Sequence, residues 1–230
     1  MIDDLRRYLD NPRNQEAVFD YLLVHMRMAL IPLVLGLLVA IPVGWAAQRN
    51  RRLRAVVLGA TNILYTVPSL ALFVILPSIL GTKILDEINV VVALAIYTAA
   101  LLVRPVVDAI DALPAHVLAA ATAVGYRPLW RFLTVELPLA VPVLVAGVRV
   151  ASVSNISLVS VGALIGVGGL GQLFTEGFQS SYNPPIIVGI VLTLALALVV
   201  DLLLVGGRRL LTPWQTRPAR VKVTAVRSAA

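Results

Sequence analysis

The sequence predicts an all-α membrane protein with about five transmembrane helices, and three observations carry this prediction. Hydrophobic residues make up 59% of the 230 residues and charged residues 13%, whereas soluble domains contain about 45–50% and about 25%. The apolar residues also gather into long runs without Asp, Glu, Lys or Arg, and a spanning helix needs about 20 such residues. A closed barrel would instead need alternating strands of about ten residues, so the runs are predicted to be helices.

Five runs follow one another along the chain, and each is predicted to be one transmembrane helix. They are residues 28–48, 55–82, 88–103, 137–175 and 177–200, and only Arg149 interrupts the fourth. Pro and Gly inside the runs do not argue against this, because membrane helices tolerate both.

Lys and Arg predict the orientation of these spans. With the N-terminus outside, the cytoplasmic segments hold thirteen Lys and Arg residues and the outer segments four, as the positive-inside rule requires. The chain then divides into an extracytoplasmic segment (1–20), a transmembrane domain (21–207) and a basic cytoplasmic tail (208–230), which is expected near anionic lipid headgroups. The net charge of +7 is therefore assigned to topology, and no nucleic-acid partner is predicted.

Composition also argues against an enzyme. The chain contains no cysteine and two histidines, which excludes disulfides and thiolate chemistry. No cluster of His, Asp and Glu suggests a metal or catalytic site, so none is predicted. His25, at the outer end of the first run, is interpreted as an interfacial residue.

The longest segment between runs, from Arg104 to Glu136, is predicted to form one or two short helices at the cytoplasmic surface. Gly125 should end the first of them, and Pro138 should open the next span, where a missing N–H costs nothing. Small residues beside basic and aromatic ones suit a docking surface for another protein, although a plain interfacial helix fits equally well. The candidate docking residues are Ala119, Ala120, Ala121, Gly125, Tyr126, Arg127, Trp130, Arg131, Leu137 and Pro138.

The spacing Ala120-Ala121-x-x-x-Gly125, with Leu137-Pro138 twelve residues further on, resembles the EAA loop of ABC importer permeases. Ala119 stands where that family usually has Glu. Other segments are similar to the glycine betaine, carnitine and choline branch of the family, and the resemblance covers about residues 20–207. These segments are Ile41-Pro-Val-Gly44, Thr66-Val-Pro-Ser-Leu-Ala-Leu72, Val135-Glu-Leu-Pro-Leu-Ala140, Ala146-Gly-Val-Arg149, Ala163-Leu-Ile-Gly-Val-Gly-Gly-Leu-Gly171 and 198–201.

This resemblance implies a type I ABC importer permease fold, with a coupling loop at about residues 112–137 that docks into an ATPase. The implied partners are two ATPase subunits, a second permease (a copy or a paralogue) and an extracytoplasmic solute-binding protein. ATP and Mg would belong to the ATPases, and this chain would hold no cofactor. The implied cargo is an osmoprotectant such as glycine betaine, choline, carnitine or proline. The alternatives are another cargo, such as methionine, and a stand-alone secondary transporter.

A glycine-rich stretch follows the fourth run, with Gly166, Gly168, Gly169 and Gly171. By its letters it matches a dinucleotide fingerprint, but no strand precedes it and no acidic residue follows at the required distance. It is predicted to be a tightly packed outer loop that forms part of a gate or meets a delivery protein, unless it is a simple turn.

Two charged residues are predicted to lie at similar depth, Arg149 inside the fourth run and Asp201 directly after the fifth. Charges within spans are costly and are usually paired or functional, so these two are expected to form an ion pair. The alternative is that each reaches separately toward the inner interface.

Polar side chains within the runs could line a path for solute. Tyr65 and Tyr97 are singled out because quaternary ammonium groups bind aromatic faces. The alternative is that these groups form hydrogen bonds between helices. The candidates are Asn62, Tyr65, Thr66, Ser69, Tyr97, Ser154, Asn155 and Ser157.

Overall fold

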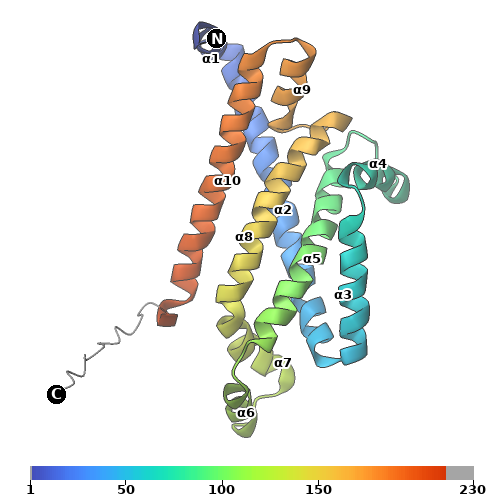
Figure 1. Ribbon diagram of the computed structural model, residues 1–230, viewed down its shortest axis with the longest axis vertical. Coiled ribbons are helices and arrows are strands. Elements are labelled where there is room, and N and C mark those ends of the chain that lie inside the picture. Colours follow the sequence, from blue (N-terminus) through green and yellow to red (C-terminus); the bar gives the residue numbers. More distant parts are fainter. Residues whose placement is uncertain (1, 216–230) are drawn as a thin grey trace, which may run out of the picture.

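The computed structural model describes residues 2–215, and these residues form an elongated helical bundle (Figure 1). The all-α class is confirmed. In chain order the elements are α1 (Ile2–Leu9), α2 (Pro12–Arg49), α3 (Arg51–Thr66), α4 (Ser69–Leu80), α5 (Glu87–Asp111), α6 (Ala115–Ala123), α7 (Pro128–Arg131), the π-helical turn η1 (Phe132–Glu136), α8 (Leu137–Gly162), the 3-10 turn η2 (Ala163–Ile165), α9 (Gly171–Gln179), α10 (Asn183–Leu211) and the 3-10 turn η3 (Pro213–Gln215).

Four continuous helical segments are long and apolar enough to cross a bilayer. They are α2, α5, α10 and the segment Pro128–Ile165, in which α7, η1, α8 and η2 follow one another without a break. The bent pair α3 and α4 makes a fifth span if the two are counted together, so the expectation of about five spans stands.

The second run is not the single straight helix expected for residues 55–82. The chain turns by 103° between α3 and α4, because Val67 and Pro68 both adopt extended backbone conformations. Proline disfavours the helical conformation in the residue before it. The carbonyl of Val67, which the break leaves without a helical partner, accepts a hydrogen bond from the Tyr97 hydroxyl at 2.5 Å.

The ends of the other predicted spans also need correction. The helix that contains the first span begins at Pro12, so the predicted boundary at residue 20 falls inside α2, and the helix that contains the third continues to Asp111, which places Arg104 within α5. The fourth run ends as a helix at Ile165, and residues 171–175 belong to α9. The fifth helix covers Asn183–Leu211, so it passes the predicted boundary at 207. The predicted tail from residue 216 onward lies outside the described residues.

Pro138 lies in the first turn of α8, as expected, but the helical segment that contains α8 already begins at Pro128. Directly before Pro138, the N–H of Leu137 bonds to the carbonyl of Phe132, five residues back. A proline inside a helix lacks an N–H and its ring collides with the preceding turn, and a local π-helical adjustment is one way in which membrane helices satisfy the backbone groups that a proline frees.

The core of the bundle is built around α2, α5 and α8, and α2 packs against α5 more extensively than any other pair of described elements. Glycines make this close approach possible. A Cβ added at Gly44 would lie 2.6 Å from a methyl carbon of Val106, and one added at Gly36 would lie 2.5 Å from Cγ2 of Thr98. Small residues serve the same purpose at helix interfaces in membranes generally.

A buried polar cluster joins these three helices. Asn155 of α8 donates to the carbonyl of Ala29 in α2 at 3.2 Å and exchanges hydrogen bonds with the Thr98 hydroxyl of α5 at 2.9–3.1 Å. Asn155 and Thr98 are each 2% exposed, so water cannot take the place of these partners.

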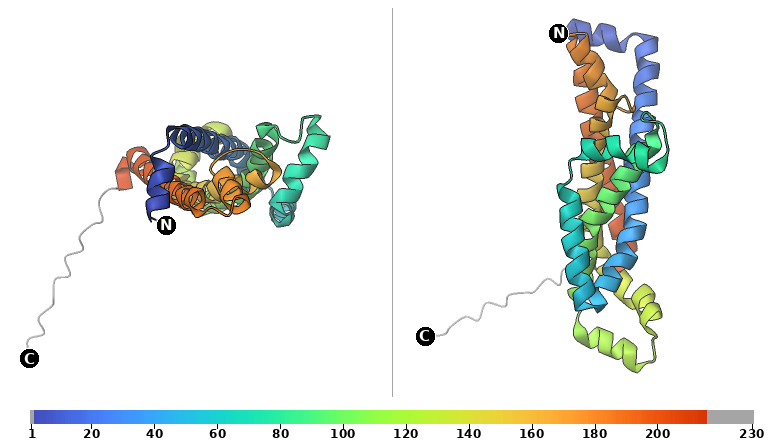
Figure 2. Two further views of the ribbon diagram at one scale, coloured as in Figure 1. Left: turned by 90° about the horizontal axis from the view of Figure 1, so that it is seen from above. Right: turned by 90° about the vertical axis from the view of Figure 1, so that its right-hand side faces the viewer.

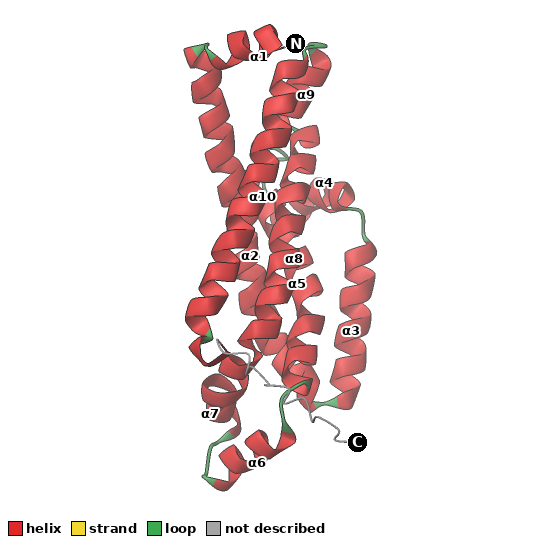
Figure 3. Ribbon diagram, turned by 60° about the vertical axis from the view of Figure 1, so that its left-hand side comes forward, coloured by secondary structure: helices red, strands yellow, loops and turns green. Residues whose placement is uncertain are grey.

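The two ends of the bundle differ. The N-terminus, α1 and α9 lie at one end, and α6 and α7 lie at the other (Figures 1 and 3). Helix α4 runs across the bundle axis rather than along it, as the two further views show (Figure 2). Any surface formed by α6 and α7 is therefore the full length of the bundle away from the N-terminus.

Candidate functional site

The turn after α6 is shaped by Gly125. The N–H of Tyr126 bonds to the carbonyl of Ala121 and the N–H of Gly125 to that of Thr122, which is the Schellman pattern for ending a helix. Gly125 has a φ of +94°, a left-handed conformation that costs glycine little. It ends α6 as expected and directs the chain back toward α7.

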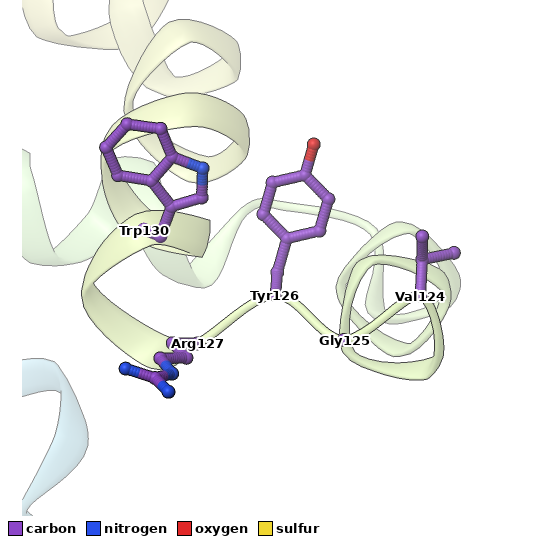
Figure 4. Close-up of a pocket in the computed structure, with 5 residues that line it drawn as sticks. All are labelled: Val124, Gly125, Tyr126, Arg127 and Trp130. Carbon is purple, nitrogen blue, oxygen red and sulfur yellow. The ribbon is translucent and has the colours of Figure 1, made fainter.

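Beyond this turn the chain forms a hollow of about 340 Å³ lined by Val124, Gly125, Tyr126, Arg127 and Trp130. Figure 4 shows the Tyr126 and Trp130 rings standing side by side on one side of the chain, while Arg127 points to the other. Trp130 is 61% exposed and Val124 80%. We call residues 112–130 the α6–α7 knob. Its exposed aromatic and small side chains are available to a partner.

Arg131 was expected to be a docking residue, but its contacts lie within the chain. Its Nε donates to the carboxylate of Glu136 at 2.7 Å, and its Nη1 donates to the Thr122 hydroxyl at 2.7 Å. Glu136 is 2% exposed, so Arg131 supplies the counter-charge of a buried acid and at the same time ties α6 to η1. Leu137 and Pro138 are half-buried in the continuous helix behind the knob.

The end of α2 also contacts this region, through residues that sequence reasoning missed. Trp45 packs on Phe132 with ring centroids 5.0 Å apart. The guanidinium of Arg49 lies 4.2 Å from the Trp45 ring centroid and donates to the carbonyl of Pro128. The spacing of Trp45 and Arg49 by one helical turn was the available signal.

The glycine loop, residues 166–171, is held by His25. This residue was expected to lie at the membrane interface, but it is buried. Its Nδ1 accepts the N–H of Leu170 at 3.2 Å, so the proton is on Nε2, which donates to the carbonyl of Ile156 at 2.9 Å. Gly166 and Gly169 have positive φ angles, and Gly169 packs directly on the His25 ring. Gly168 and Gly171 are also closely packed. A Cβ at Gly168 would lie 3.3 Å from a methyl carbon of Val24, and one at Gly171 would lie 2.6 Å from the carbonyl oxygen of Ser160.

Four of the expected path residues come together and four do not. Tyr65, Tyr97, Ser154 and Asn155 line one cavity of about 10 Å³, in which the two tyrosine rings meet edge to face at 6.1 Å. Asn155, as described, bonds between helices. Asn62 and Ser157 are exposed elsewhere, Thr66 bonds back to the carbonyl of Ile63, and Ser69 begins α4.

Arg149 of α8 meets Asp201 of α10 in a two-pronged ion pair. Nε donates to one carboxylate oxygen at 2.5 Å and Nη2 to the other at 2.8 Å. The pair borders a hollow of about 460 Å³ that Ala146, Val150, Val153 and Ser154 also line. Two parallel hydrogen bonds fix the orientation of the guanidinium relative to the carboxylate.

The described residues thus form a multi-pass helical bundle with a helical knob at one end and polar groups within its spans. The chain belongs to the family described as binding-protein-dependent transport system inner membrane component, whose model matches residues 24–206. This family places the protein in the membrane, which it crosses several times.

Similar proteins fall within the same class. The chain is 34% identical to an osmoprotectant import permease protein, OsmW, of Salmonella typhimurium, with 82% of this chain and 89% of that one covered. It is 33% identical to a choline transport system permease protein, OpuBB, of Bacillus subtilis, with 82% and 86% covered. Among solved structures, the MetNI methionine ABC transporter in an inward-facing conformation matches with a TM-score of 0.76 at 22% identity, covering 90% of this chain and all of that one. The type I ABC importer permease fold is thus confirmed.

Proposed function

We propose that this permease imports osmoprotectants of the glycine betaine, carnitine and choline class in an ATP-driven complex. Support for the cargo comes from the relatives, which carry the names of osmoprotectant, choline and glycine betaine/carnitine/choline permeases at 32–34% identity. The methionine transporter that shares the fold is less similar in sequence, at 22%.

The α6–α7 knob is the single observation that supports coupling to an ATPase. It carries exposed Tyr126 and Trp130 on a rigid turn, and large aromatic side chains are the residues that dominate protein interfaces. We assign the knob to the cytoplasm, since the excess of Lys and Arg lies on that side of the spans. The N-terminus, α1 and α9 then lie outside.

The proposed complex contains two ATPase subunits, a second permease and an extracytoplasmic solute-binding protein. A relative from Helicobacter pylori combines both functions in its name, as an ergothioneine transport permease and ergothioneine binding protein. In this proposal ATP and Mg bind to the ATPases, and this chain supplies the path and the coupling surface.

Coupling is tested by co-purification with the ATPase expressed alongside. Trp130→Ala and Gly125→Arg should each lose the ATPase, the first by removing an exposed anchor and the second by straining the turn. Trp214→Ala is the matched control, because Trp214 is a 55% exposed tryptophan outside the knob. Retention of the ATPase by both knob variants would place the docking surface elsewhere.

The cargo is tested in proteoliposomes that contain the complete complex. ATP-dependent uptake of labelled glycine betaine, carnitine or choline, unaffected by excess methionine, is the expected result. Methionine uptake alone would replace the proposed cargo, and uptake by this chain without any ATPase would reveal a stand-alone transporter.

A further inference from the structure

The ion pair of Arg149 and Asp201 lies deep within two spans. Arg149 is twelve residues beyond the start of α8 and Asp201 ten residues before the end of α10, which corresponds to about 18 Å and about 15 Å along the helices. The side chains nevertheless remain 42% and 24% exposed, so the pair is only partly covered by its own chain.

The exposure of the two charged side chains determines whether the hollow beside them can face lipid. Charged side chains inside a membrane face protein or a water-filled cavity, because hydrocarbon solvates them poorly. We place the adjoining hollow of about 460 Å³ at the interior of the assembled transporter, because protein or water must cover the exposed pair there. In a transport subunit that interior contains the solute path.

Arg149 also keeps hydrogen-bonding capacity that the pair does not use. Nε and Nη2 donate to Asp201, and no other described residue accepts a bond from Nη1. A guanidinium has five N–H donors in a fixed fork. Asp201 holds this fork in place, and the Nη1 edge is free to receive a carboxylate.

The charge of the pair favours one class of solute. Arg149 and Asp201 together are neutral, so a zwitterion can bind beside them without leaving a net charge buried in the membrane. Ser154 lines both this hollow and the small cavity formed by Tyr65 and Tyr97. The Tyr65 ring is 47% exposed and offers an aromatic face of the kind that attracts a quaternary ammonium group, whereas Tyr97 is 4% exposed and packs edge to face against Tyr65.

We propose that Arg149, oriented by Asp201, binds the carboxylate of zwitterionic trimethylammonium solutes in the path, while the Tyr65 ring contacts the cationic end. This proposal rests on the proposed function and adds the chemical basis of its selectivity. Glycine betaine has both groups, whereas choline has the same cation and a hydroxyl in place of the carboxylate. Comparing uptake of the two solutes therefore distinguishes carboxylate binding by Arg149 from the requirements for transport that both solutes share.

The test compares uptake of glycine betaine and choline by the complete complex in proteoliposomes. The variant Arg149→Gln/Asp201→Asn removes both charges together, which avoids an unpaired buried charge and keeps side chains that bond to each other. Glycine betaine uptake should fall about tenfold or more, because a hydrogen bond to a charged group is lost, while choline uptake should change about twofold or less. Val143→Ala, an exposed position on the same helix that lies outside both hollows, should leave both rates unchanged.

A second variant covers the case in which the neutral pair fails to assemble. Arg149→Lys keeps the charge next to Asp201 but loses the fork, and it should lower glycine betaine uptake more than choline uptake. Equal loss of both solutes, or no loss of either, would overturn the carboxylate site and leave the ion pair a structural contact only. If the wild-type complex imports neither solute, the proposed function itself is wrong.

Discussion

Gly36 lies where α2 packs against α5, and replacing it with alanine tests whether the buried polar cluster depends on this close approach. The new methyl group would lie 2.5 Å from Cγ2 of Thr98 and 2.9 Å from the backbone nitrogen of Ala99, well inside ordinary contact distance. The helices must therefore move apart, and this displaces the Thr98 hydroxyl from Asn155.

Overpacking of this kind costs about 1–3 kcal/mol, and an interhelical hydrogen bond in a membrane contributes about 0.6 kcal/mol. Alanine gains up to about 1 kcal/mol of helix propensity over glycine. The net loss in the free energy of unfolding for Gly36→Ala is thus about 1–3 kcal/mol.

The assay is unfolding of the purified protein in mixed detergent micelles with increasing SDS, monitored by helical circular dichroism. Gly59→Ala is the matched control, because Gly59 is also within a helix and a Cβ there would meet nothing within 4 Å. That variant should equal or exceed the wild type in stability. If Gly36→Ala is as stable as Gly59→Ala, the close packing of α2 on α5 does not support the polar cluster as argued.

Two further predictions concern contacts made by buried titratable side chains. Glu136→Gln weakens the contact between η1 and α6 that Arg131 makes, so the knob should open locally more often. Chymotrypsin should then cleave after Tyr126 several-fold faster, with cleavage after Trp214 as the internal reference. An unchanged ratio of the two cleavage rates would mean that the buried carboxylate does not fix the knob. His25→Ala removes the acceptor of the Leu170 N–H, so hydrogen–deuterium exchange of that amide should speed up about tenfold or more, and exchange at the wild-type rate would refute the role of His25 in holding the glycine loop.

The membrane spans and the end of α6 at Gly125 could be predicted from the sequence, because both depend on local composition. A long apolar run has one stable solution in a bilayer, and glycine after a short helix favours a left-handed cap. The sharp break at Val67 and Pro68 was missed because proline alone does not distinguish a break from a tolerated kink. Pro42 and Pro142 lie inside continuous helices of the same protein.

Tertiary contacts explain the remaining differences at the site. The expectation that Arg131 faces a partner used its charge and spacing, whereas its position depends on the buried carboxylate of Glu136 and on Thr122. His25 was assigned to the interface because it stands alone in the sequence, yet its partners are 131 and 145 residues away. Arg149 and Asp201 were easier to place together, because a membrane leaves few partners for a charge at a given depth.

The construction of the knob has a consequence for protein engineering. The side chain of Thr122 joins it to the helix behind it through Arg131, and the carbonyl of Pro128 joins it to α2 through Arg49, whereas the α2, α5 and α8 core involves none of its residues. Residues 112–130 therefore form a cassette that can be transplanted between permeases if Thr122 and Arg131 are kept. If the knob docks the ATPase as proposed, a chimera built this way exchanges its motor subunit while retaining its solute.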